Sequence, residues 1–244
     1  MTRLNANCVK FAVKQIACEV ERRLRPLPSV ELDDSALRRE LACCILSSQV
    51  SYESAIGAVE QIEAAGLFAA APRSKIRAQA IIQSVLEKPY TYSGRTMRYR
   101  FPKTKSVQLA QAYEVIKCEF GSIRDLLRRN SESVVCREWL VANVPGMGPK
   151  QSSMFLRNAV GAFDLAVLDR HVFRYMALAN VAPESTFQSV RNLRDYRVQE
   201  DRLRSHASYE GFSLGVFDWA IWIVMRAVAG VEKDEHSDIS VRWA

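Results

Sequence analysis

Apolar residues along most of this chain recur at the spacing of a helical face rather than at the alternation of a strand. An amphipathic helix is predicted over residues 5–24, with apolar positions at Phe11, Val13, Ile16, Ala17 and Val20. Pro26 and Pro28 end this helix, because proline has no amide hydrogen with which to continue the hydrogen-bond ladder.

Further apolar stripes predict helices in the rest of the chain. In the first of them, Ser35 is placed to cap a helix with Leu37, Leu41, Cys44 and Ile45 on one face. The next stripe ends at Gly66 and contains Ala55, Ile56, Val59 and Ile62. Another closes at Gly121 and contains Val107, Ala110, Tyr113, Ile116 and Phe120. A charged helix then reaches Arg204, and the closing helix holds Leu214, Phe217, Trp219, Ile221 and Trp222.

The sequence contains no strand alternation, internal repeat or flexible linker, which predicts an all-α fold of two lobes flanking a cleft. We expect residues 1–244 to form a single unit, in which residues 1–40 and 160–244 make the first lobe. Residues 41–159 then make the second lobe, with six helices and a hairpin turn.

The hairpin turn is the sequence Pro145-Gly146-Met147-Gly148, which interrupts a helical apolar pattern. Pro149 follows at a position that the first turn of a new helix tolerates. The pattern predicts a helix-hairpin-helix, in which Gly146 and Gly148 allow a DNA phosphate to approach bare backbone amides at a helix N-terminus. An ordinary corner between two helices is the alternative that the turn alone leaves open.

Two charged residues follow the turn. Lys150 opens the second helix, and Asp169 precedes another apolar run, so both side chains face one cleft if the two helices pack side by side. This combination resembles the helix-hairpin-helix DNA glycosylase superfamily. The similarity is greatest to the compact, archaeal-type 8-oxoguanine DNA glycosylases, through the segments GMGPKQSSMFLRN, LDRH and DWAIW. It extends over about residues 30–225, and the chain continues beyond Trp222 for longer than that family does.

The resemblance implies roles for the two charged residues. A neutral amine at Lys150 attacks the sugar of a flipped-out nucleotide, displaces the base and forms an imine. Asp169 stabilises positive charge on the sugar and helps to move the lysine proton. From the residues alone, a lysine such as Lys150 is most often a surface residue, and an aspartate such as Asp169 before an apolar helix is most often an N-cap worth about 1 kcal/mol.

The resemblance also implies residues that contact DNA. Gln49, within CCILSSQVSYESA, matches a polar residue that enters the duplex opposite the lesion, and His171 matches a phosphate ligand. Met154, Asp218 and Trp222 match positions that line the base pocket. The alternatives are a solvated glutamine, a structural histidine and core packing for the other three residues.

Residues 88–105 form the most basic segment, and aromatic residues are interleaved with its charges. We interpret it as a loop in which Arg98 and Arg100 neutralise DNA phosphates, with a solvated connector as the alternative.

Composition adds further limits. The formal net charge of +7 suits a polyanionic partner. The six cysteines are scattered, so we expect buried thiols and no metal or other cofactor. No apolar run reaches the roughly 18 residues that a membrane helix needs, and no signal peptide is recognisable, which favours a cytoplasmic protein at the nucleoid.

Together these features predict a monomeric, bifunctional DNA glycosylase and AP lyase of base excision repair. Its predicted substrate is double-stranded DNA that contains 8-oxoguanine. The alternatives are a glycosylase for another modified base and a non-catalytic helix-hairpin-helix protein that binds DNA.

Overall fold

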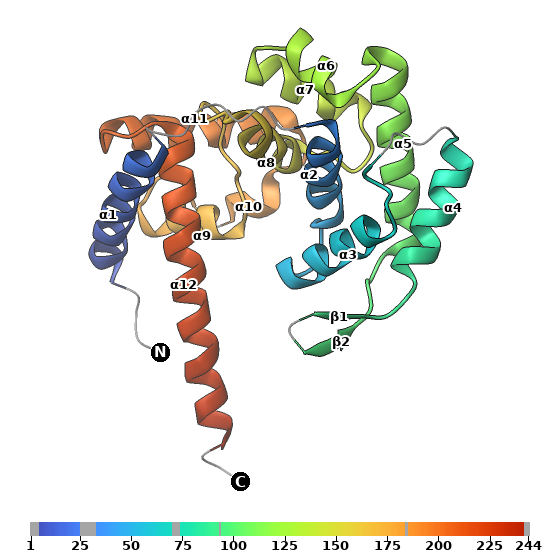
Figure 1. Cartoon of the computed structure of the whole chain (residues 1–244). Helices are drawn as coiled ribbons and strands as arrows, with labels where there is room; N and C mark the ends of the chain where they lie inside the picture. The colour runs from blue at the N-terminus through green and yellow to red at the C-terminus, as the bar shows by residue number, and fades with distance from the viewer. Residues whose placement is uncertain (1–4, 25–32, 70–73, 93, 184, 242–244) are drawn as a thin grey trace. The chain divides into compact units, whose positions relative to one another are not determined.

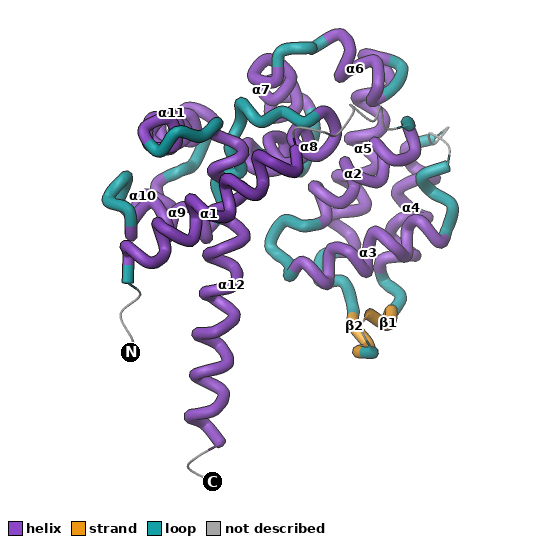
Figure 2. Tube along the Cα trace, turned by 60° about the vertical axis from the view of Figure 1, so that its left-hand side comes forward, coloured by secondary structure: helices purple, strands orange, loops and turns teal. Residues whose placement is uncertain are grey.

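The described residues of the chain are mostly helical, which confirms the predicted fold class (Figures 1 and 2). The computed structural model describes residues 5–24, 33–69, 74–92, 94–183 and 185–241. The helices are α1 (Ala6–Leu24), α2 (Asp34–Leu46), α3 (Tyr52–Ala64), α4 (Lys75–Leu86), α5 (Pro102–Phe120), α6 (Ile123–Arg129), α7 (Ser133–Asn143), α8 (Pro149–Val160), α9 (Arg170–Leu178), α10 (Thr186–Ser189), α11 (Leu193–Tyr209) and α12 (Leu214–Val241). Two short strands, β1 (Tyr90–Tyr92) and β2 (Arg95–Met97), lie between α4 and α5.

The structure divides into two compact units. Unit 1 contains Met1–Pro28 and Phe163–Ala244, and unit 2 contains Ser29–Ala162. The sequence-based division at residue 40 falls inside α2, whereas the structure keeps this helix whole within unit 2. The reason is that α2 packs against α3, α5, α6 and α8 of the same unit.

The core of unit 1 forms where α1 and α9 pack against α12. The face of α1 that enters this core consists of Val9, Val13, Ala17 and Val20. Phe11, which the sequence analysis placed on an apolar face, is 65% exposed. Pro26 and Pro28, the expected end of the helix, lie outside the described residues.

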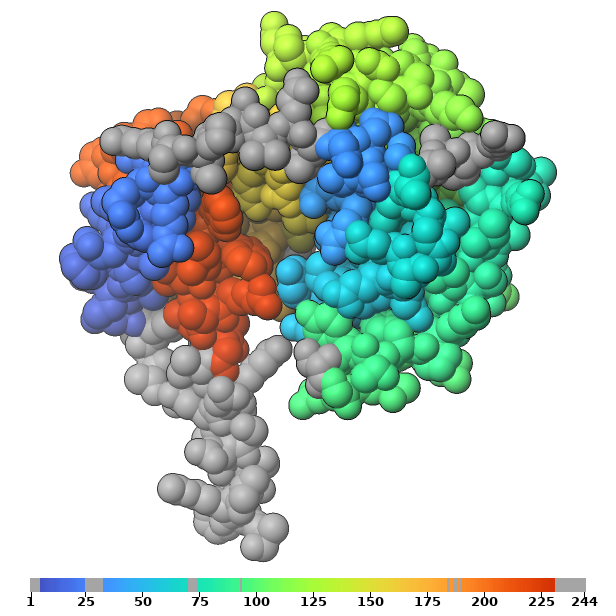
Figure 3. Space-filling model, in the orientation of Figure 1, coloured from blue at the N-terminus to red at the C-terminus, as the bar shows by residue number. Residues whose placement is uncertain are grey.

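Unit 2 is built around α2, and Figure 3 shows the surface where the blue residues of α2 meet the yellow-green residues of α6. The N-cap of α2 is Asp33, whose side chain accepts a hydrogen bond of 2.7 Å from the Ala36 amide. The prediction of Ser35 as the cap was therefore wrong. Either residue type can cap a helix, and the structure places Asp33, not Ser35, in the extended conformation that a cap requires.

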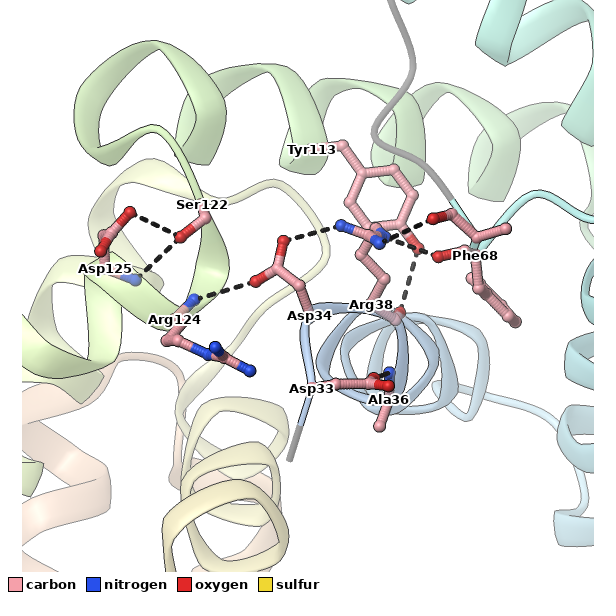
Figure 4. Close-up of polar contacts among 10 residues, drawn as sticks. Asp33, Asp34, Ala36, Arg38, Phe68, Tyr113, Ser122, Arg124 and Asp125 are labelled. Atoms are coloured by element: carbon pink, nitrogen blue, oxygen red, sulfur yellow. Dashed lines mark hydrogen bonds and ion pairs between the residues drawn. The ribbon is translucent and has the colours of Figure 1, made fainter. Parts of the chain in front are cut away.

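A buried arginine ties α2 to the rest of unit 2 (Figure 4). The Arg38 guanidinium donates to the carbonyl of Phe68 at 2.8 Å and to the Asp34 carboxylate at 2.7 Å. Tyr113 of α5 donates its hydroxyl to the Arg38 carbonyl at 3.0 Å, and the other Asp34 oxygen accepts from the Arg124 amide at 3.3 Å. A buried charge is tolerated here because it is fully paired.

The segment expected to be a loop contains a β-hairpin. Tyr90 pairs with Met97 and Tyr92 pairs with Arg95 in an antiparallel ladder, and Gly94 has a φ of +75° in the turn. The strands are too short for their alternation to be recognised in the sequence. The Tyr90 ring packs so closely on Gly57 of α3 that a Cβ there would lie 2.2 Å from it.

The cysteines differ partly from the expectation of buried thiols. Cys44 and Cys136 are buried, and burial raises the pKa of the Cys136 thiol to about 12. Cys8, Cys18 and Cys118 are exposed.

Along the described residues, no single helix is long and apolar enough to cross a membrane. Taken together, α11 and the part of α12 up to Gly230 meet these criteria of length and composition, but the two helices are bent by 93° relative to each other.

Candidate functional site

The connection between α7 and α8 is a tight hairpin in unit 2. After Asn143, the Met147 amide donates to the carbonyl of Val144 at 3.1 Å, which closes the turn. Gly146 has a φ of +86°, in the left-handed region that favours glycine. Pro149 is the first residue of α8, as predicted, because its missing amide hydrogen has no acceptor at that position.

The first turn of α8 contains backbone amides that have no acceptor among the described residues. Gly148 is the N-cap and supplies no side chain, and no described residue accepts a hydrogen bond from the amides of Lys150 or Gln151. Free amides at a helix N-terminus, together with the positive end of the helix dipole, attract an anion. The predicted function of Gly146 and Gly148 is chemically consistent with this geometry.

A groove of about 640 Å³ lies beside the hairpin, within unit 2. Gln49, Gly146 and Gly148 all line it, so the structure brings Gln49 beside the two hairpin glycines, from which it is far apart in the sequence. Gln49 is exposed and has a φ of +64°, a conformation that costs a residue with a Cβ roughly 1 kcal/mol or more. Such strain is typical of functional positions, which favours a role for Gln49 in binding.

A lysine that the sequence analysis did not single out also lines this groove. Lys105 of α5 is only 6% exposed, and burial lowers the pKa of its ammonium group. The sequence contains one signal, the spacing of four residues that Lys105 shares with Leu109 and Tyr113, but Lys105 belongs to the basic segment that we interpreted as a loop.

Lys150 and Met154 lie one turn apart on α8 and are both half-buried, so they share a face of this helix. Arg98 and Arg100 are both exposed, on either side of a buried Tyr99. The Tyr99 hydroxyl donates to the Leu46 carbonyl at 2.7 Å, which anchors the segment between β2 and α5 to the end of α2. This anchor directs the two arginines to solvent, where they can meet a phosphate.

Asp169 is the N-cap of α9 in unit 1, which confirms its predicted capping role. Its Oδ1 accepts hydrogen bonds from the amides of His171 at 2.8 Å and Val172 at 3.0 Å. The other carboxylate oxygen has no hydrogen-bond partner among the described residues. One oxygen therefore fixes the side chain while the second is available for chemistry.

The irregular segment that leads to Asp169 is held by side chains from α11 and α12. The Ala166 amide donates to Glu200 at 2.8 Å, and the Leu168 amide donates to the Tyr196 hydroxyl at 2.9 Å. Tyr196 in turn donates to the Ala166 carbonyl at 2.7 Å. Sequence reasoning missed both side chains because α11 looked like a solvated, charged helix.

Asp218 belongs to the same supporting set. Its Oδ2 accepts from the Val167 amide at 2.9 Å, and the residue is 1% exposed. The structure thus gives Asp218 a part in positioning the segment before Asp169. Its predicted role in the base pocket stays a prediction.

The N-terminal end of α9 carries a group of basic residues. Burial lowers the pKa of His171, the nearby Asp169 raises it, and Arg170, Arg174 and Arg226 lower it further. Arg226 of α12 also lies over the Trp222 ring, 5.0 Å from the ring centroid. The structure thus brings His171 and the predicted stacking residue Trp222 near one cationic surface of unit 1.

The helical fold and the glycine hairpin define the class of protein, which is the helix-hairpin-helix DNA glycosylases. The model of the 8-oxoguanine DNA glycosylase family matches residues 20–211, and the chain belongs to this family.

Several relatives agree with this assignment. The 8-oxoguanine DNA glycosylase/AP lyase of Sulfurisphaera tokodaii is 32% identical over 187 residues, which cover 75% of this chain and 79% of the relative. The crystal structure of the 8-oxoguanine DNA glycosylase of Thermotoga maritima has a TM-score of 0.58 at 26% identity and covers 88% of this chain and 89% of its own.

The 8-oxoguanine glycosylase/lyase of Methanocaldococcus jannaschii, in complex with 15mer DNA containing 8-oxoguanine, has a TM-score of 0.59 at 21% identity. The match covers 88% of this chain and 88% of that one, and it supports the fold.

The first prediction concerns the supports of Asp169. Tyr196→Phe removes the acceptor of the buried Leu168 amide and should lower the free energy of unfolding by about 1–3 kcal/mol. Thermal or urea unfolding measures this change. Tyr209→Phe, on the same helix but 86% exposed, is the matched control and should be neutral. Equal stability of the two variants would contradict the supporting role of Tyr196.

Proposed function

We propose that this protein is a bifunctional DNA glycosylase and AP lyase that excises 8-oxoguanine from double-stranded DNA and then nicks the strand. The main support for the proposal is that the chain belongs to the 8-oxoguanine DNA glycosylase family. A second support is the position of Lys150, in the first turn of the helix that follows the glycine hairpin. Acting on DNA, the protein would work in the cytoplasm at the nucleoid, as a monomer.

The base must leave the helical stack before reaction, because the sugar carbon C1′ is shielded within the duplex. The amine of Lys150 then uses its lone pair to form a bond to C1′, while the bond from C1′ to the base breaks. The base departs with that electron pair and takes up a proton. Loss of the amine proton and opening of the sugar leave an imine, which activates the 2′ proton for removal and the 3′ phosphate for departure.

Asp169 stabilises the positive charge that develops on the sugar as the base leaves. Its free carboxylate oxygen is suited to this task, since the capping oxygen holds the side chain in one orientation. The supports from Tyr196 and Glu200 add to this orientation by fixing the preceding backbone.

The remaining predicted residues bind the DNA. We propose that Gly146, Gly148, His171, Arg98 and Arg100 contact phosphates and that Gln49 enters the duplex opposite the lesion. Met154, Asp218 and Trp222 would line the pocket for the extruded base.

The second prediction tests the nucleophile. Lys150→Gln should abolish base release, strand nicking and borohydride trapping. The reaction rate should fall by several orders of magnitude, and each tenfold loss corresponds to about 1.4 kcal/mol of activation free energy. Binding to undamaged duplex should persist, because the hairpin amides remain. Lys103→Gln, which removes an exposed lysine of α5, is the control and should be trapped like the wild type.

Trapping is measured with a panel of duplexes that each carry one modified base. If only a different base gives an adduct, the substrate assignment is wrong but the lysine chemistry stands. If Lys150→Gln still nicks an abasic site, another amine is the nucleophile.

The third prediction separates the two functions of Asp169. Asparagine caps a helix about as well as aspartate, so Asp169→Asn should stay folded with an unchanged unfolding temperature. It should nevertheless slow base excision strongly, because the negative charge is lost. Single-turnover excision rates and thermal unfolding are the two measurements. Wild-type turnover by this variant would leave Asp169 only its structural role.

The fourth prediction concerns the base pocket. An abasic site has no base to recognise, so Trp222→Ala and Asp218→Asn should lose base excision and still nick a preformed abasic site. The stacking plane lost with Trp222 is worth about 1–3 kcal/mol per base. If Asp218→Asn lowers the unfolding temperature and slows both reactions equally, Asp218 acts by holding the Val167 amide rather than by contacting the base.

A further inference from the structure

The groove beside the hairpin contains a charge that the folded protein leaves unpaired. Lys105 is 6% exposed and lines the groove, and no described residue accepts a hydrogen bond from its ammonium or forms an ion pair with it. Taking a cation out of water without a partner is costly, and burial lowers its pKa accordingly. A buried charge of this kind is explained if its partner is a ligand.

The surroundings of Lys105 determine the sign of that ligand. The described residues of the groove lining include no carboxylate, and Lys105 is the one charged side chain among them. Gly148 and Gln151 of the same lining belong to the start of α8, where free amides and the helix dipole add positive potential. The Lys105 ammonium and the start of α8 thus contribute positive potential to one groove, and an anion would compensate both.

We propose that this groove is a binding subsite for a backbone phosphodiester of DNA and that Lys105 supplies its buried positive charge. The proposal rests on the proposed function, because it takes the ligand to be the nucleic acid on which the enzyme acts. A phosphodiester carries one negative charge and several acceptor oxygens. The single ammonium matches the charge, while the amides and the side chains of Ser48 and Gln49 match the oxygens.

Burial distinguishes Lys105 from the exposed cations Arg98 and Arg100. An exposed cation is hydrated and screened by salt before DNA arrives, whereas burial has removed part of the hydration of Lys105. The free protein is therefore destabilised by a group that becomes paired only in the complex. Replacing Lys105 by an apolar residue of similar length should make the protein more stable and its binding to DNA weaker, a combination that a merely structural lysine does not produce.

The fifth prediction compares Lys105→Met with the matched control Lys103→Met, which removes an exposed charge from the same helix. Fluorescence anisotropy with a short, labelled, undamaged duplex gives the affinity over a series of salt concentrations. Lys105→Met should reduce the slope of log K against log salt by about one unit, and Lys103→Met should reduce it by less. An unchanged slope for Lys105→Met, or an equal reduction in both variants, overturns the proposal.

Thermal unfolding without DNA supplies the second readout. Lys105→Met should unfold at a higher temperature than the wild type, and a lower temperature would assign Lys105 a structural role instead. Inorganic phosphate at matched ionic strength tests the source of the anion. If phosphate raises the unfolding temperature of the wild type but not of Lys105→Met, while the two proteins show the same salt slope with DNA, then free phosphate is the occupant and the assignment to DNA is overturned.

Borohydride trapping of the wild type keeps this proposal separate from the proposed function. If the wild type is trapped on damaged DNA while Lys105→Met keeps the wild-type slope, only the subsite is wrong. If the wild type is never trapped but the slope changes as expected, the enzyme assignment fails and the phosphodiester contact stands.

Discussion

The absence of a side chain at Gly146 is the constraint on which the hairpin and its groove depend. A Cβ at this position would lie 2.9 Å from Gln108 Oε1 and 3.2 Å from Ile45 Cγ2, and the backbone has a φ of +86°. Glycine therefore satisfies two requirements at once, the left-handed turn and the close approach of α2 and α5 to the hairpin. Because these elements converge there, Gln49 and Lys105 line one groove with the start of α8.

Two buried cations of unit 2, Arg38 and Lys105, differ in whether the folded protein supplies a partner for their charge. Arg38 and Lys105 are 7% and 6% exposed, so both have left water to a similar extent. Arg38 donates to two backbone carbonyls and to Asp34, and it joins α2 to the segment after α3. No described residue pairs with the Lys105 ammonium. Arg38 is therefore paired within the folded protein, whereas Lys105 gains a partner only when a ligand binds.

Unit 1 uses buried side chains to hold backbone that forms no regular structure. The amides of Ala166, Val167 and Leu168 donate to Glu200, Asp218 and Tyr196 in turn. Each bond satisfies a buried polar group, which would otherwise cost roughly 1–3 kcal/mol. These bonds fix the backbone that precedes Asp169. The Asp169 carboxylate then caps α9 with one oxygen and leaves the other oxygen available.

The sequence by itself determined the features that depend on neighbouring residues. Helical periodicity located α1, α5 and α8, the Pro-Gly-x-Gly turn located the hairpin, and Asp169 before an apolar run was correctly assigned as a cap. Only the tertiary structure decided the partners of Tyr196, Glu200 and Asp218, which lie 28, 34 and 51 residues from the amides they bind. It also decided that Lys105 is buried while Lys103 is exposed. Periodicity reports which residues share a face of a helix, but burial and long-range hydrogen bonds depend on which other helix covers that face.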